Sequence, residues 1–84
     1  MQRRDTGQPI RTAMKEAGLS IASLAAKTRE VDPAGYGIKP ATIGHMVSQG
    51  ASGRDSFTDR SCDLVARALD KPIADLFRDA STRA

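Results

Sequence analysis

The stretch LVARALDKPIADLF, residues 64–77, holds the most specific pattern in the chain. Its apolar residues recur at helical spacing, and Pro72 is suited to opening a new helix. We predict a helix over 59–69, with Thr58 as its N-cap and Phe57 as the apolar residue before the cap, and a short helix over 72–77. The side chains expected to face inward are Cys62, Val65, Ala66, Leu69, Ile73, Leu76 and Phe77.

Three more helices are predicted upstream of this stretch. The first opens at Pro9 and stops at Gly18, the second follows Ser20 as its N-cap and runs to about Thr28, and the third covers 40–48. Their apolar stripes are Ile10, Ala13, Met14 and Ala17; Ile21, Leu24, Ala25 and Thr28; and Ile43, Met46 and Val47. No strand-like alternation of useful length is present, so the expected fold is all-α, with five short helices.

The length of 84 residues allows one domain. We expect a flexible N-terminal arm at 1–8, a folded domain at 9–77 and a frayed tail at 78–84. Asp32-Pro33 and Gly35-Tyr36-Gly37 are turn signals, so 29–37 is expected to form a loop between the second and third helices.

Composition narrows the class of protein. Residues 1–50 carry the whole formal net charge of +3, whereas 51–84 are balanced, so a polyanion is expected to meet the first fifty residues. The lone Cys62 excludes an internal disulfide, and no apolar run approaches the roughly 18 residues of a membrane span. The basic N-terminus has no apolar stretch behind it, so we expect a cytoplasmic protein.

Three stretches together resemble the Cro/repressor (XRE-like, lambda-repressor-like) helix-turn-helix family of DNA-binding proteins. LSIASLAAKT at 19–28 resembles the family's second helix, GIKPATIGHMVSQG at 37–50 its turn and recognition helix, and LVARALDKPIADLF at 64–77 its usual ending. The resemblance covers about 9–77. It implies that the second helix crosses the DNA backbone and supports the third helix in the major groove.

The resemblance also implies a set of DNA contacts. Base edges would be met by Lys39, Ala41, Thr42, Gly44, His45 and Ser48, with Thr42 and His45 as the best candidates. Lys39 and Ser48 would reach either bases or phosphates. Phosphates would be met by Ser20, Ser23, Arg29, Gln49, Ser52 and Arg54, and the arm residues Arg3 and Arg4 would follow a groove. Relatives often form dimers through the last helices, so Leu76 and Phe77 lie either at a two-fold interface or in the core.

The chain departs from the family pattern at three places. Ile38 lies about eight residues later than the family places it, so 29–36 is interpreted as an insertion that adds DNA contacts or alters the angle between the two helices. Ile21 stands where the family often has Gln. Pro40 and Gly44 weaken the recognition helix.

The sequence offers few signals for functions other than DNA binding. Cys62 is expected in the core. No metal site is indicated, because no second Cys or His has ligand spacing. No cofactor or small-molecule site is indicated either. An enzyme is not expected, because no catalytic set is evident. A protein-interaction module, such as an antitoxin or adaptor, would expose an apolar patch around Ile21, Tyr36 and Val47. We expect a sequence-specific phage or bacterial repressor that binds a double-stranded operator, as a homodimer or as a monomer.

Overall fold

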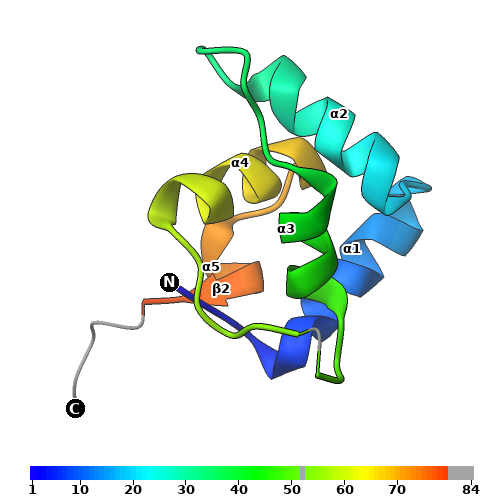
Figure 1. The fold of residues 1–84 in the computed structure, drawn as a ribbon, viewed down its shortest axis with the longest axis vertical. Coiled ribbons are helices and arrows are strands. Elements are labelled where there is room, and N and C mark those ends of the chain that lie inside the picture. The colour runs from blue at the N-terminus through cyan, green and yellow to red at the C-terminus, as the bar shows by residue number, and fades with distance from the viewer. Residues whose placement is uncertain (52, 80–84) are drawn as a thin grey trace.

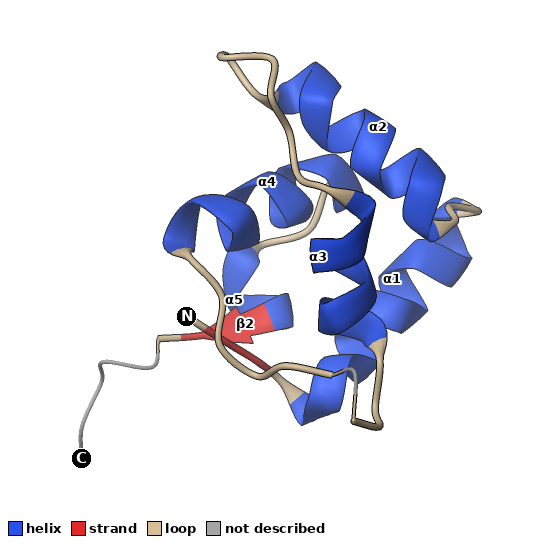
Figure 2. Ribbon diagram, viewed as in Figure 1, coloured by secondary structure: helices blue, strands red, loops and turns tan. Residues whose placement is uncertain are grey.

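The chain folds into a mostly helical domain, as the sequence predicts (Figures 1 and 2). The computed structural model describes residues 1–51 and 53–79. Its elements are β1 (Gln2–Arg3), the 3-10 helix η1 (Asp5–Gly7), α1 (Gln8–Ala17), α2 (Ile21–Val31), α3 (Pro40–Val47), α4 (Asp59–Leu69), α5 (Ile73–Leu76) and β2 (Phe77–Arg78). None of the helices in this described part is long and apolar enough to cross a membrane.

The helices begin and end largely where local sequence signals place them. The hydroxyl of Ser20 accepts a hydrogen bond from the Ser23 backbone N–H at 3.1 Å, and Thr58 does the same for Ser61 at 3.2 Å. Each cap satisfies a backbone donor that the first turn of a helix leaves unpaired. Gly18 ends α1 in the left-handed conformation, with φ of +69°. These expectations are confirmed.

A single apolar core joins the five α-helices of the described residues. α2 packs on α3 and α4, while α1 packs against α3, α4 and α5. The largest fully buried side chains are Phe77, Ile10, Leu24, Ile43, Met46, Leu76, Val65, Thr28 and Cys62. Leu76 and Phe77 are therefore core residues, and the alternative that they form a two-fold interface is wrong. The core position of Cys62 is confirmed.

The N-terminal residues are not a free arm, contrary to the expectation for residues 1–8. β1 pairs antiparallel with β2, Gln2 opposite Arg78 and Arg3 opposite Phe77, in a two-stranded sheet that the sequence does not predict. Arg3 is buried. Arg4 is exposed, but its Nε donates to the carbonyl of Ala74 at 2.7 Å. Backbone and guanidinium hydrogen bonds hold this segment against the rest of the fold. Their partners are distant in the sequence, so no local sequence pattern predicts them.

The second helix is longer than predicted and the fifth is shorter. α2 continues to Val31, so Arg29 lies in its last turn rather than in a loop. The connection to α3 consists of 32–39, with no regular structure. α5 ends at Leu76 because Phe77 turns to an extended conformation and joins the sheet.

Candidate nucleic-acid interface

The outward face of α3 is built from small and polar side chains. Ile43 and Met46 are fully buried, so the helix is anchored on one side. The opposite side presents, with full or partial exposure, Lys39 at the N-cap followed by Ala41, Thr42, Gly44, His45 and Ser48. Short side chains allow a helix backbone to come close to a partner surface, and polar ones can meet base edges. The structure thus brings the six predicted base-contact residues together.

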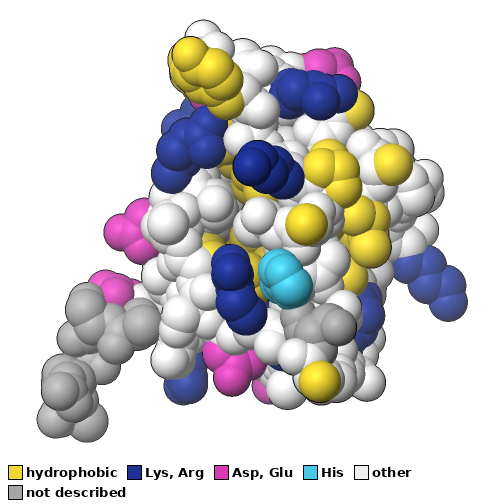
Figure 3. All heavy atoms as spheres, in the orientation of Figure 1, with side chains coloured by type: hydrophobic (Ala, Val, Ile, Leu, Met, Phe, Trp, Pro, Cys, Tyr) yellow, Lys and Arg dark blue, Asp and Glu magenta, His cyan; other side chains and the backbone are white. Residues whose placement is uncertain are grey.

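Positive charge surrounds this face. The chain has no Asp or Glu between Asp32 and Asp55, whereas this interval contains the cations Lys39 and Arg54. Figure 3 shows the histidine near the middle of the viewed face with Lys and Arg side chains nearby, while acidic side chains lie toward the margins. Such a surface attracts a polyanion.

Arg54 is held beside α3 by two contacts. Its backbone N–H donates to the carbonyl of His45 at 3.0 Å. Its guanidinium carbon lies 4.9 Å from the centre of the Phe57 ring, a cation–π contact. The side chain remains exposed, so the charge of Arg54 is available next to His45.

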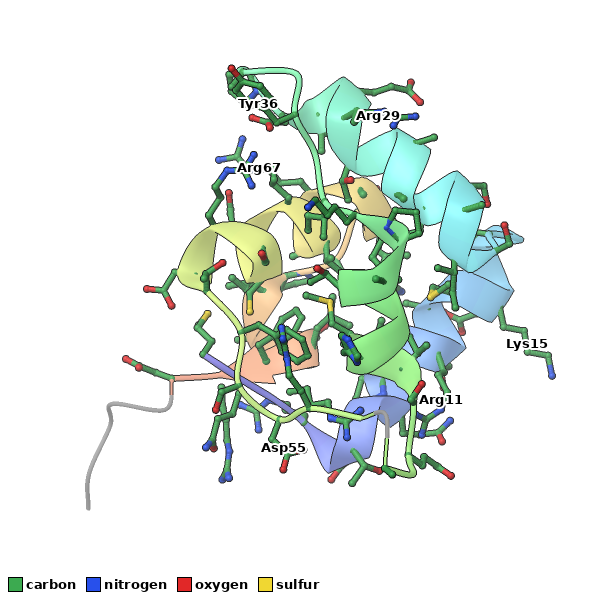
Figure 4. The ribbon with its side chains drawn as sticks, viewed as in Figure 1. Arg11, Lys15, Arg29, Tyr36, Asp55 and Arg67 are labelled. Atoms are coloured by element: carbon green, nitrogen blue, oxygen red, sulfur yellow. The ribbon has the colours of Figure 1, made fainter. Side chains whose placement is uncertain are left out.

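The C-terminal end of α3 is closed by two arginines from the start of the chain. Arg3 Nη1 donates to the carbonyls of His45, Met46 and Ser48 at 3.2, 3.1 and 2.6 Å. Arg11 Nη1 donates to the carbonyl of Val47 at 2.6 Å, and Figure 4 shows Arg11 beside this end of α3. The last carbonyls of a helix lack helical partners and carry partial negative charge, which a cation stabilises. Arg3 therefore positions α3, and the prediction that it follows a DNA groove is wrong.

The loop that leads into α3, residues 32–38, is organised by Asp32. The Asp32 side chain accepts hydrogen bonds from the backbone N–H groups of Ala34, Tyr36 and Gly37 at 2.9, 3.0 and 2.9 Å. Arg60 Nη2 of α4 also donates to it, at 2.6 Å. The hydrogen bonds from Gly37 and Ala34, with the charge of Arg60 and the bond from Tyr36, lower the pKa of the Asp32 carboxyl although burial opposes this. Asp32 is thus ionised at neutral pH.

The remaining amides of loop 32–38 are also paired. Gly35 N–H donates to the Asp32 carbonyl at 2.9 Å, and Ile38 N–H donates to Thr28 Oγ1 at 3.0 Å. Thr28 is fully buried in α2. The sequence alone predicts Asp32 only as a turn residue and Thr28 only as part of an apolar stripe. The useful signal is an Asp-Pro pair followed by two glycines, since Asp side chains accept bonds from the amides that follow them.

The predicted phosphate contacts are distributed around α3. Arg29, Gln49 and Arg54 are exposed, whereas Ser52 lies outside the described residues. Ser20 and Ser23 are exposed at the start of α2, but their hydroxyls and amides bond to one another as a capping box. Their hydroxyls therefore serve the helix end first.

The two large apolar side chains that are exposed among the described residues, Ile21 and Tyr36, do not form one patch. Tyr36 is 80% exposed at the tip of loop 32–38, and Ile21 is 37% exposed at the start of α2. The eleven residues of α2 separate them, a distance of about 15 Å along the helix axis. Val47 is only partly exposed. Tyr36 and Ile21 therefore do not lie in the one patch that the protein-interaction alternative expects of them.

Burial raises the pKa of the Cys62 thiol to about 11, so it is protonated at neutral pH. Among the described residues, no group of three His, Cys, Asp or Glu side chains is placed to hold a metal ion.

Comparisons with known proteins add no assignment. The chain matched no protein-family model, no curated protein and no solved structure. The geometry of α3 and its surroundings is therefore the basis for a functional proposal.

Proposed function

We propose that this chain is a sequence-specific, double-stranded DNA-binding transcription regulator that places α3 in the major groove. The proposal rests on one observation. The outward side of α3 exposes small and polar side chains, and the segment that contains α3, residues 33–54, has no acidic residue. The major groove, about 12 Å wide, admits a helix and presents a different pattern of donors and acceptors for each base pair. α2, which packs on α3, would cross the backbone as in helix-turn-helix domains.

Base reading would fall to the middle of α3 and phosphate binding to its borders. His45 and Thr42 lie on the outward side, and both can form hydrogen bonds with base edges. Lys39, Arg29 and Arg54 are exposed, and none of them takes part in the ion pairs found among the described residues. Cations that are outside ion pairs can neutralise DNA phosphates and release their counterions. Occupation of an operator would then block polymerase.

The test is selection of duplexes from a random pool, followed by salt titrations on the enriched duplex and on a scrambled control. We expect one enriched motif that is bound far more tightly than the control, with log affinity falling linearly as log salt concentration rises. The symmetry of the motif will show whether one or two subunits bind. Weak, uniform binding without enrichment would overturn the proposal.

Two variants distinguish a phosphate contact at the border of α3 from an effect of overall charge. Lys39→Ala should weaken binding to both duplexes and reduce the salt slope by about one, if it meets a phosphate. Lys15→Ala is the matched control, because Lys15 is exposed on α1 and points away from α3 (Figure 4). An equal effect of both substitutions would show that only overall charge matters.

A further inference from the structure

The tip of loop 32–38 combines a fixed backbone with an exposed aromatic side chain. Every backbone N–H from Ala34 to Ile38 donates to an oxygen of the chain. Arg60 attaches the loop to α4 through Asp32 and through the carbonyl of Gly37, at 2.6 and 3.3 Å. The side chain of Tyr36 nevertheless points away from the fold and is 80% exposed (Figure 4).

A fixed loop of this kind is suited to binding a rigid partner. Segments that are ordered before association lose less conformational entropy when they bind. The bonds that order the loop involve the backbone of Tyr36, so its ring and hydroxyl are not needed for the local fold. The exposed ring and hydroxyl of Tyr36 are therefore available to a partner.

Two exposed cations and one exposed acidic residue lie at the ends of loop 32–38. Arg29 is in the last turn of α2, next to the exposed Glu30, and Lys39 is at the N-cap of α3, so the cations flank the loop in sequence and outnumber the exposed carboxylate. Both cations are exposed and outside the ion pairs of the described residues. The acidic residue within the loop, Asp32, is buried and neutralised by Arg60.

We infer that loop 32–38 is a second DNA contact, in which the Tyr36 hydroxyl donates to a backbone phosphate outside the bases read by α3, while Arg29 and Lys39 supply positive charge at the two ends of the loop. This inference rests on the proposed function and deepens it. The loop precedes the N-terminal end of α3, so it extends the footprint beyond that end of the helix. The contact adds affinity without sequence preference, because phosphates carry no base information.

The test compares Tyr36→Phe with the unchanged protein on the enriched duplex and on its scrambled control. Tyr36→Phe should weaken binding to both duplexes by about ten- to hundredfold, the loss of one hydrogen bond to a charged group. The salt slope should stay unchanged, because no charge is removed. Thermal unfolding should also stay unchanged, since the hydroxyl makes no bond that stabilises the loop. Arg29→Ala should reduce the slope by about one, whereas the control Lys15→Ala should not.

Phosphate ethylation of the enriched duplex locates the contact. Ethylation of one phosphate flanking the motif should inhibit the unchanged protein and have no further effect on Tyr36→Phe. If the unchanged protein selects a motif and Tyr36→Phe binds it equally well, loop 32–38 is not a DNA contact, and the proposed function stands without it. If no motif is enriched, the proposed function itself fails.

Discussion

Substitution of Gly37 by Ala tests the close approach of loop 32–38 to α2. Gly37 has φ of +65°, and a Cβ there would collide with Cγ of Arg29 and lie 2.7 Å from its backbone nitrogen. Gly35 has φ of +77°, but a Cβ there meets nothing within 4 Å. The two positions therefore share the conformational cost of a left-handed Ala and differ in the collision.

The expected losses of stability follow from these two terms. A left-handed conformation costs an L-residue about 1–2 kcal/mol, and the smaller entropy of the unfolded Ala chain offsets part of it. Gly35→Ala should therefore lower the free energy of unfolding by about 1 kcal/mol. Gly37→Ala adds a backbone displacement of the kind that costs about 1–3 kcal/mol, for a total of about 3 kcal/mol. For a domain of this size, 1 kcal/mol corresponds to a change of about 4–8 °C in Tm.

The assay is urea unfolding followed by circular dichroism, with DNA affinity as a second measurement. Gly18→Ala serves as a control, because Gly18 has φ of +69°, open space around its Cβ and no part in the loop. We expect Gly18→Ala and Gly35→Ala to behave alike and Gly37→Ala to lose more stability. Equal losses for Gly35→Ala and Gly37→Ala would refute the close approach of the loop to α2.

Four further outcomes are expected. Arg3→Ala should lower the free energy of unfolding by about 3 kcal/mol, because three carbonyls lose a charged donor. Arg3→Lys should not restore the lost stability. A loss below about 1 kcal/mol for Arg3→Ala in urea unfolding would contradict the role of Arg3 at α3. Because the folded pKa of Asp32 is lowered, its contribution is complete above its usual pKa of 3.8 and is lost as pH falls below that value. Asp32→Asn should remove this part of the pH dependence of stability, measured by urea unfolding across acidic pH. Cys62 should resist iodoacetamide at mildly alkaline pH in the folded protein and react once guanidinium chloride unfolds it, since burial raises its pKa to about 11; rapid labelling of the folded protein would show that α4 opens. His45→Ala should relax base preference at one position of the motif, by about 1–3 kcal/mol; an equal loss on all duplexes would remove His45 from base reading.

Local sequence was sufficient wherever a structural feature depends on near neighbours. Ser20 and Thr58 cap helices because each hydroxyl reaches an amide three residues later. Gly18 ends α1 because a residue without a Cβ adopts positive φ at low cost. Periodic apolar residues placed the 59–69 helix, and with it Cys62 in the core. The outward side of α3 follows from the same periodicity, since Ile43 and Met46 define the buried side.

Only the tertiary structure decided which polar groups became internal. Arg3 looks like part of a basic arm, yet it is buried because the unpaired carbonyls it meets belong to residues more than forty positions later. Asp32 looks like a turn residue, yet Arg60 of α4 completes its environment. Leu76 and Phe77 suit an interface or a core equally well by composition. Burial depends on which surfaces of distant segments meet, and that is a property of the packed chain rather than of any local pattern.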